Sequence, residues 1–142
     1  MFKVGLVTSL FNKEITLRLK SAAHKYLTSM GCQILEVDVP GAIEIPVACA
    51  WLIQKKCDGI VTCGAVIRGE TTHYDFVWQS VERGITTLMI THMIPITVGI
   101  LTTENEEQAL ERAGGTHGNK GEEAAQACMH MMQLKKQLLL IQ

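Results

Sequence analysis

The stretch GAVIRGETTHYDF, residues 64–76, places glycines, hydroxyl groups, charges and a histidine where an apolar run ends. It differs by one residue from the nucleotide-binding pattern G-x-x-x-x-G-K-[ST], because Glu70 occupies the position of the phosphate-binding lysine. Two like charges about 4 Å apart repel by about 4 kcal/mol at an effective dielectric of about 20, so a triphosphate is not expected here. A single phosphate stays compatible with the loop, because free N–H groups at a helix start bind phosphate monoesters.

Thr71 and Thr72 stand where this loop should enter a helix, and threonine commonly caps a helix with its hydroxyl group. Capping alone would explain both residues, so the capping and phosphate-binding interpretations stay open. Arg112 and Lys120 are the candidate cations for a phosphate. Their spacing in the chain does not by itself bring either of them to this loop.

His73 falls in the first turn of the same expected helix and is the candidate acid–base group. The alternative is an exposed histidine with no chemical role. The other four histidines show no spacing typical of metal ligands, and no metal is expected: His24, His92, His117 and His130.

Two more segments could contact a planar ligand. Phe11 follows a strand end, where an aromatic ring can stack on a heterocycle or act as a hydrophobic staple for the next helix. Residues Ala42, Ile43 and Glu44 offer backbone groups and one carboxylate to the edge of a heterocycle. Glu44 would equally be a favourable charge in the first turn of a helix.

Short apolar runs that alternate with helical patterns must position these residues. Strands are expected over residues 4–7, 34–39, 59–66 and 95–101. Helices are expected over residues 10–31, 43–56, around 77–89, 104–113 and 121–140, with HGNKG (117–121) as a break. The first helix should bury Ile15, Leu19, Ala22, Tyr26 and Met30.

This order predicts an α/β fold, a three-layer sandwich with a four-stranded parallel sheet and helices on both faces. Ligands of such folds bind beyond the carboxyl ends of the strands. That rule selects residues 9–12, 39–44, 67–74 and 101–103. Most of the candidate residues lie in these four segments.

Composition narrows the class of protein. The 142 residues suit a single domain (1–142), and a chain that is 47% hydrophobic and 19% charged can bury a core. A net charge of −1 gives no reason to expect nucleic acid. Five cysteines with no C-x-x-C pair favour a reducing cytoplasm. A membrane-spanning helix needs an apolar run of about 18 residues, and the sequence contains none that long. The first residues resemble a core strand rather than a signal peptide.

Four segments together resemble the lumazine synthase family. They are FNKEIT (11–16), PGAIEIP (40–46), GAVIRGETTHYDF (64–76) and LTTENEEQALERAGGTHGNKG (101–121). The resemblance covers nearly the whole chain in the same order, and it implies a flavodoxin-like fold assembled as pentamers, in some members as a sixty-subunit shell. It implies condensation of 5-amino-6-(D-ribitylamino)uracil with 3,4-dihydroxy-2-butanone 4-phosphate to 6,7-dimethyl-8-ribityllumazine, with loss of phosphate and two waters. It implies no metal and no organic cofactor.

The resemblance also implies roles for individual residues. Phe11 matches the aromatic that stacks on the pyrimidine, and His73 matches the proposed proton shuttle. Arg112 and Lys120 match phosphate-site cations that a neighbouring subunit contributes. The remaining matches are the segment at the ribityl chain (Ala42, Ile43, Glu44), the strand end beside the ring (Val66, Ile67, Arg68) and the phosphate loop (Glu70, Thr71).

The chain departs from the family at two aromatic positions and at its N-terminus. Ile43 and Val98 stand where many members have phenylalanine, and Val98 would reach in from the neighbour. The sequence lacks the N-terminal segment of shell-forming members, but its compact GGTHGNKG turn resembles theirs. A pentamer is therefore expected, and a sixty-subunit shell and association with riboflavin synthase stay open. The alternatives are an inactive flavin- or lumazine-binding or shell-forming homologue and a pentameric riboflavin synthase.

Overall fold

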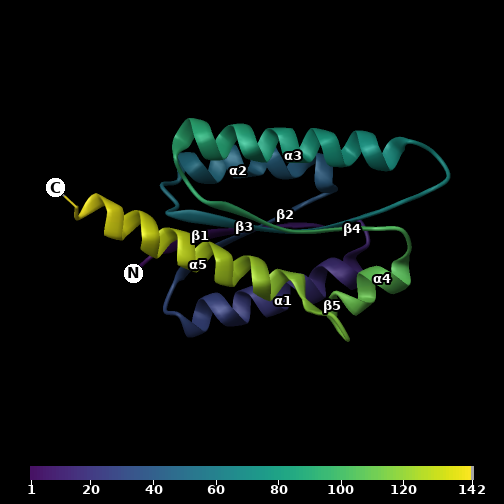
Figure 1. The fold of residues 1–142 in the computed structure, drawn as a ribbon, viewed down its shortest axis with the longest axis horizontal. Coiled ribbons are helices and arrows are strands. Elements are labelled where there is room, and N and C mark those ends of the chain that lie inside the picture. The colour runs from purple at the N-terminus through teal and green to yellow at the C-terminus, as the bar shows by residue number, and fades with distance from the viewer. Residues whose placement is uncertain (142) are drawn as a thin grey trace.

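The computed structural model describes residues 1–141 and shows one sheet between two layers of helices (Figure 1). Its elements along the chain are β1 (Lys3–Ser9), α1 (Lys13–Ser29), β2 (Gln33–Val39), the 3₁₀ turn η1 (Ala42–Glu44), α2 (Ile45–Gln54), β3 (Gly59–Ile67), α3 (His73–His92), β4 (Ile96–Thr103), α4 (Glu106–Glu111), β5 (Ala113–Gly115), β6 (Gly118–Asn119) and α5 (Lys120–Leu139).

The main sheet has the strand order β2-β1-β3-β4, and every pairing in it is parallel. Helices α1 and α5 cover one face, and α2 and α3 cover the other (Figure 1). The predicted four-stranded α/β sandwich is therefore confirmed. The inner strand β3 is buried at eight consecutive positions, Gly59 to Val66, because helices cover both of its faces. The edge strand β2 mixes exposed and half-buried residues and buries only Val39.

Each face of the sheet has its own hydrophobic core. One core joins β1 and β3 to α1 and α5 through Leu6, Leu19 and Ala125, and the other joins β3 and β4 to α2 and α3 through Ile60 and Ile85. Most of the cysteines belong to these cores. Burial raises the pKa of the Cys49, Cys63 and Cys128 thiols to about 12. No helix of residues 1–141 combines the length and apolarity needed to cross a membrane.

The buried stripe of helix α1 matches the predicted one at Ile15 and Leu19 and departs from it further along the helix. Its buried residues are Ile15, Thr16, Leu19, Ala23 and Leu27. The predicted Ala22 and Tyr26 are only half-buried, and Met30 is 40% exposed. Both stripes have helical spacing, so periodicity alone could not choose between two faces one residue apart.

Two local elements differ from the prediction. The segment between the last two helices is not only a break, because β5 and β6 form a small antiparallel hairpin there with a bulge between Ala113 and Gly115. The second helix begins with η1 and becomes α-helical only at Ile45, with Pro46 in its first turn. Proline fits there because the first turn has no intrahelical partner for its missing N–H.

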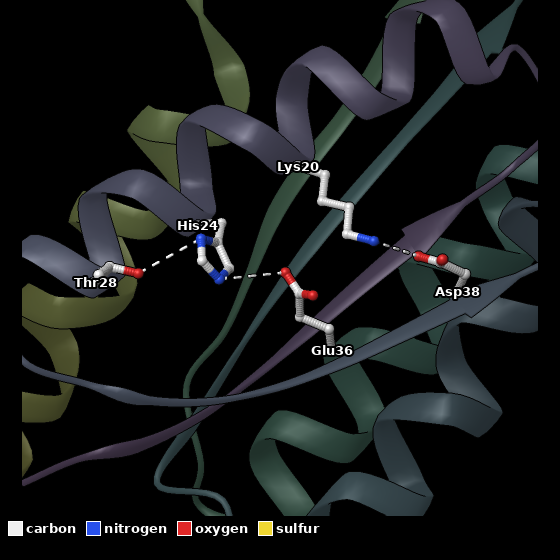
Figure 2. Close-up of polar contacts among 5 residues, drawn as sticks. All are labelled: Lys20, His24, Thr28, Glu36 and Asp38. Atoms are coloured by element: carbon white, nitrogen blue, oxygen red, sulfur yellow. Dashed lines mark hydrogen bonds and ion pairs between the residues drawn. The ribbon is translucent and has the colours of Figure 1, made fainter.

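The edge strand β2 is tied to α1 by polar side chains (Figure 2). The Lys20 ammonium lies 3.1 Å from the Asp38 carboxylate. His24 Nε2 lies 3.6 Å from Glu36 Oε1, and its Nδ1 lies 3.5 Å from the Thr28 hydroxyl. These contacts place charged groups along a strand whose outer side is unpaired within residues 1–141.

The tightest contact between helices is that of α5 with α1 at Gly121. A Cβ atom built at Gly121 would overlap the carbonyl oxygen of Leu19 and lie 2.6 Å from the carbonyl carbon. Only glycine permits this approach, since the obstructing atoms belong to the backbone and cannot rotate away. The crossing fixes the start of α5, and with it the position of Lys120.

Gly121→Ala should therefore destabilise the fold by about 1–3 kcal/mol or more, because one helix must move to admit a methyl group. Chemical denaturation followed by circular dichroism measures the change in the free energy of unfolding. Gly69→Ala is the matched control, since its added methyl group meets nothing within 4 Å. Equal stability of the two variants would contradict this account of the crossing.

Candidate functional site

One cavity, which we call the main cavity because it collects most of the predicted site residues, lies at the carboxyl ends of the strands, on the α2 and α3 side of the sheet. Its volume is about 340 Å³. Its lining residues come from the loop after β1, the turn at η1, the end of β3, the loop after β3 and the start of α3, and comprise Phe11, Gly41, Ala42, Ile43, Glu44, Ala65, Val66, Ile67, Gly69, Thr71, His73, Tyr74 and Val77. The structure thus brings together eight of the predicted site residues: Phe11, Ala42, Ile43, Glu44, Val66, Ile67, Thr71 and His73.

Backbone hydrogen bonds between two loops position Phe11. The Leu10 amide donates to the Val39 carbonyl at 2.8 Å, and the Phe11 amide donates to the Pro40 carbonyl at 3.0 Å. A hydrophobic staple would pair Phe11 with residue 16, which is a buried threonine. Phe11 is instead 70% exposed and lines the main cavity, as an aromatic available for stacking would.

Glu44 stabilises the turn that enters α2. Its Oε1 accepts a hydrogen bond from the Gly41 amide at 2.9 Å, which closes the η1 turn. Ala42 is buried beneath this turn, whereas Ile43 is 39% exposed. Glu44 therefore has a structural role and also lines the cavity, so the two interpretations of its sequence position are compatible.

The loop before α3 presents Thr71 and His73 to the same cavity. Thr72 is the N-cap residue but makes no capping hydrogen bond with its side chain. The Thr71 hydroxyl accepts from the His73 amide at 3.3 Å instead. The His73 ring is exposed and stacks on Phe76, with 6.4 Å between the ring centroids. Glu70 is exposed and does not line the cavity.

Arg68 does not line the main cavity, because its side chain is bound elsewhere. Its Nε lies 2.9 Å from Glu104 Oε2, its Nη1 lies 3.5 Å from Asp75 Oδ2, and its guanidinium lies 4.3 Å from the centroid of Tyr74. Partial desolvation lowers the pKa of Arg68, but the hydrogen bond and charge of Glu104 and the charge of Asp75 outweigh it and raise the pKa. Arg68 thus links the β4 loop to the first turn of α3.

Arg112 and Lys120 lie in a different cavity, which we call the basic cavity. Its volume is about 370 Å³, and it is lined by Ile100, Leu101, Thr102, Thr103, Arg112, His117, Lys120 and Glu123. It shares no lining residue with the main cavity. Within one chain, the candidate acid–base group His73 and the candidate phosphate-binding cations Arg112 and Lys120 therefore lie in different cavities.

The β5–β6 hairpin explains why Arg112 and Lys120 lie together. The Lys120 amide donates to the Arg112 carbonyl at 2.8 Å, so the ends of the hairpin are paired. Arg112 Nη1 donates to the Gln108 carbonyl at 3.0 Å, which holds the guanidinium against α4. The Asn119 side chain accepts from the Gly121 and Glu122 amides and so caps α5.

Val98 lies in a third hollow, away from the main cavity. It is half-buried on β4 and borders a cavity of about 320 Å³ between α3 and β4 that Trp78 and Lys120 also line. Like Arg112, Val98 does not line the cavity that Phe11 and His73 share within one chain. Within a single chain, Val98 therefore has no access to a ligand stacked on Phe11.

The structure adds residues that the sequence interpretation missed. Tyr74 and Val77 line the main cavity. Val77 follows His73 by four residues, so helical spacing could have identified it, whereas Tyr74 follows by one residue and could not be found in this way. His117 and Glu123 line the basic cavity. The spacing of His117 in the sequence predicts no metal-binding role and is compatible with a histidine on the solvent-exposed surface. No group of three or more metal-ligating side chains is found among the residues that the structure describes.

Known proteins resemble this chain over nearly its whole length. The family model of 6,7-dimethyl-8-ribityllumazine synthase matches residues 1–136. A 6,7-dimethyl-8-ribityllumazine synthase of Bdellovibrio bacteriovorus is 53% identical over 139 residues, which are 96% of this chain and 76% of the relative. Enzymes of the same name from Limosilactobacillus reuteri and Coxiella burnetii are 44% and 43% identical, over 96% of this chain and 91% and 93% of theirs.

The fold and the cavities define a flavodoxin-like α/β protein whose candidate ligand sites lie at the carboxyl edge of a parallel sheet. With the matches just described, the chain belongs to the 6,7-dimethyl-8-ribityllumazine synthase family.

Arg68→Lys should loosen the first turn of α3, because an ammonium cannot bridge Glu104 and Asp75 while stacking on Tyr74. Amide hydrogen exchange over residues 69–75 should accelerate about two- to tenfold, with little change in global stability because the pair is exposed. Arg18→Lys on α1 is the control. Unchanged exchange over 69–75 would show that the link does not hold this turn.

Proposed function

We propose that this protein is an enzyme that condenses 5-amino-6-(D-ribitylamino)uracil with 3,4-dihydroxy-2-butanone 4-phosphate. The products are 6,7-dimethyl-8-ribityllumazine, phosphate and two waters, and the reaction needs no net oxidant or reductant. Residues 1–142 act as one domain. The observation that carries the proposal is the convergence of Phe11, Glu44 and His73 on one cavity, together with a separate cavity rich in cations.

The main cavity would hold the pyrimidine substrate. Phe11 supplies an exposed ring for stacking, and Val66 and Ile67 supply the apolar strand end. The backbone of the turn around Ala42 and Ile43 and the Glu44 carboxylate contact the ring edge and ribityl chain. Ile43 contributes less stacking area than a phenylalanine would, so affinity should suffer more than the chemistry.

His73 is the proposed proton shuttle. The uracil amine attacks the butanone carbonyl, and loss of water gives an imine. Enolisation then expels phosphate, ring closure follows, and loss of the second water yields the lumazine. His73 lines the cavity at the first turn of α3, where its exposed ring can exchange protons with the reacting groups and with solvent. Holding two substrates together supplies much of the remaining rate.

The phosphate would lie between the loop at Glu70 and Thr71 and the cations Arg112 and Lys120. Backbone amides of the loop bind the anion while the Glu70 side chain stays in solvent. Arg112 stabilises the phosphate as it departs. Arg112 and His73 line separate cavities of one chain. We therefore propose that each active site takes His73 from one subunit and Arg112 from its neighbour. Val98 would reach into the site from the subunit that supplies Arg112.

Exposed apolar side chains support assembly into a pentamer. On α2, Val47 is 46% and Trp51 is 61% exposed, and on α3, Phe76 is 65% and Ile90 is 74% exposed. Apolar side chains this exposed are typical of surfaces that a partner covers. We place the enzyme in the cytoplasm, where the unpaired cysteines would stay reduced.

His73→Ala should lower kcat about ten- to a thousandfold with the fold retained, because one proton-transfer group is lost. Release of phosphate from the two mixed substrates measures the rate. His92→Ala, at the other end of α3, is the control. Turnover equal to that of the unchanged protein would remove His73 from the mechanism.

Arg112→Ala should raise KM for the phosphate substrate and lower kcat, because the leaving group loses a charge-assisted partner. Refolding Arg112→Ala subunits together with His73→Ala subunits tests whether one active site uses residues from two subunits. About a quarter of the sites in a random mixture would combine an intact His73 with an intact Arg112 from the neighbour. Mixed assemblies without restored activity would place both residues in one subunit's site.

The activity itself is tested with both substrates and, separately, with the lumazine alone. Formation of 6,7-dimethyl-8-ribityllumazine with phosphate release supports the proposal. Formation of riboflavin from the lumazine alone would show a riboflavin synthase instead. Ligand binding without turnover would show an inactive homologue.

A further inference from the structure

The basic cavity contains a third nitrogen group beside Arg112 and Lys120. His117 lines this cavity from the turn that joins β5 to β6. Gly118 follows it with a positive φ of 78°, a conformation that glycine adopts easily and that closes the turn tightly. The turn therefore holds His117 beside two permanent cations.

The turn and α4 hold the His117 ring in place through one of its two nitrogens. The His117 amide donates to the Glu111 carbonyl at 2.9 Å. The ring Nδ1 lies 3.4 Å from Glu111 Oε2 and 3.1 Å from the Thr116 hydroxyl. Nε2 makes no hydrogen bond to any of residues 1–141, so it is the nitrogen available to a ligand.

The charges that face His117 favour an anion. Arg112 and Lys120 line the cavity as cations, and Glu123 on α5 is the one carboxylate among the lining residues. Glu111 on α4 contacts the ring from its Nδ1 side. With a neutral His117 the lining carries two positive charges and one negative charge, and protonation of His117 adds a third positive charge.

We propose that His117 is a phosphate-binding residue of the basic cavity and that it binds the anion as an imidazolium. Both ring nitrogens donate hydrogen bonds only in the protonated ring. Nδ1–H then donates to Glu111, and Nε2–H donates to a phosphate oxygen. The Glu111 carboxylate can only accept, so a neutral ring keeps its proton on Nδ1 and offers the anion only the lone pair of Nε2. Binding of a dianion is therefore linked to the uptake of one proton.

The ligand class follows from this geometry. A tetrahedral dianion can accept from the guanidinium, the ammonium and the imidazolium at once. Free phosphate and the phosphate group of the butanone substrate share this chemistry. Identifying the substrate's phosphate as the natural ligand rests on the proposed function, but the anion site itself does not.

Inorganic sulfate is the first probe, because it stays a dianion over the whole pH range of histidine titration. Its dissociation constant would be measured by calorimetry at about pH 6 and about pH 8, on either side of the usual histidine pKa. We expect His117→Ala to bind about three- to tenfold more weakly than the unchanged protein at the lower pH, and both to bind similarly at the higher pH. His117→Lys should bind tightly at both.

His130→Ala, an exposed histidine of α5, is the matched control, and circular dichroism confirms that each variant is folded. Equal sulfate affinity of His117→Ala and the unchanged protein at the lower pH would overturn the proposal. So would a His117→Lys variant that fails to restore binding, or an unchanged protein that binds neither sulfate nor phosphate.

Kinetics separate this inference from the proposed function. At about pH 6, His117→Ala should raise KM for the butanone phosphate, lower kcat less than Arg112→Ala does, and leave the KM of the uracil nearly unchanged. An unchanged KM for the butanone phosphate would overturn the assignment of His117 to the substrate site. Absence of turnover in the unchanged protein would overturn the proposed function alone, because sulfate binding does not depend on it.

Discussion

The parallel pairing of four strands is the constraint on which the other features depend. Because β1 to β4 all run in one direction, each loop that follows a strand emerges at the same edge of the sheet. Backbone hydrogen bonds then join neighbouring loops, from Leu10 to Val39 and from Arg68 to Thr103. The candidate site therefore inherits its geometry from main-chain pairing, which side-chain replacements disturb little. Side chains in these loops can therefore be replaced while the spacing between the loops stays the same.

The sequence was enough to predict the order of strands and helices, because continuous apolar runs and helical periodicity arise from burial itself. It was not enough to predict which stripe of α1 is buried, since Ala22 and Ala23 suit a core equally well. The β5–β6 hairpin was missed because its strands are three and two residues long and rich in glycine. Such segments bury few side chains, so they leave no hydrophobic pattern to detect.

In the candidate site, too, some features could be predicted from the sequence and others could not. Phe11, Glu44 and His73 could be predicted to lie together, because each follows a strand of one parallel sheet. The pairing of Arg68 with Glu104 and Asp75 could not, since it depends on side-chain directions in two loops. Neither could the separation of His73 from Arg112 into two cavities, because the cavity that Arg112 lines lies along the edge strand β4, away from the start of α3. Periodicity locates elements along the chain, but it carries no information on these directions.

The polar contacts between α1 and β2 have a consequence for the behaviour of the protein at high concentration. A second strand that pairs with the free edge of β2 would draw water away from the Lys20–Asp38 and His24–Glu36 groups, which lie beside that edge on the face that α1 covers. Dehydrating charges is unfavourable, so this edge discourages the stacking of copies into fibrils. The same sheet that exposes its carboxyl ends to ligands thus stays protected along its flank.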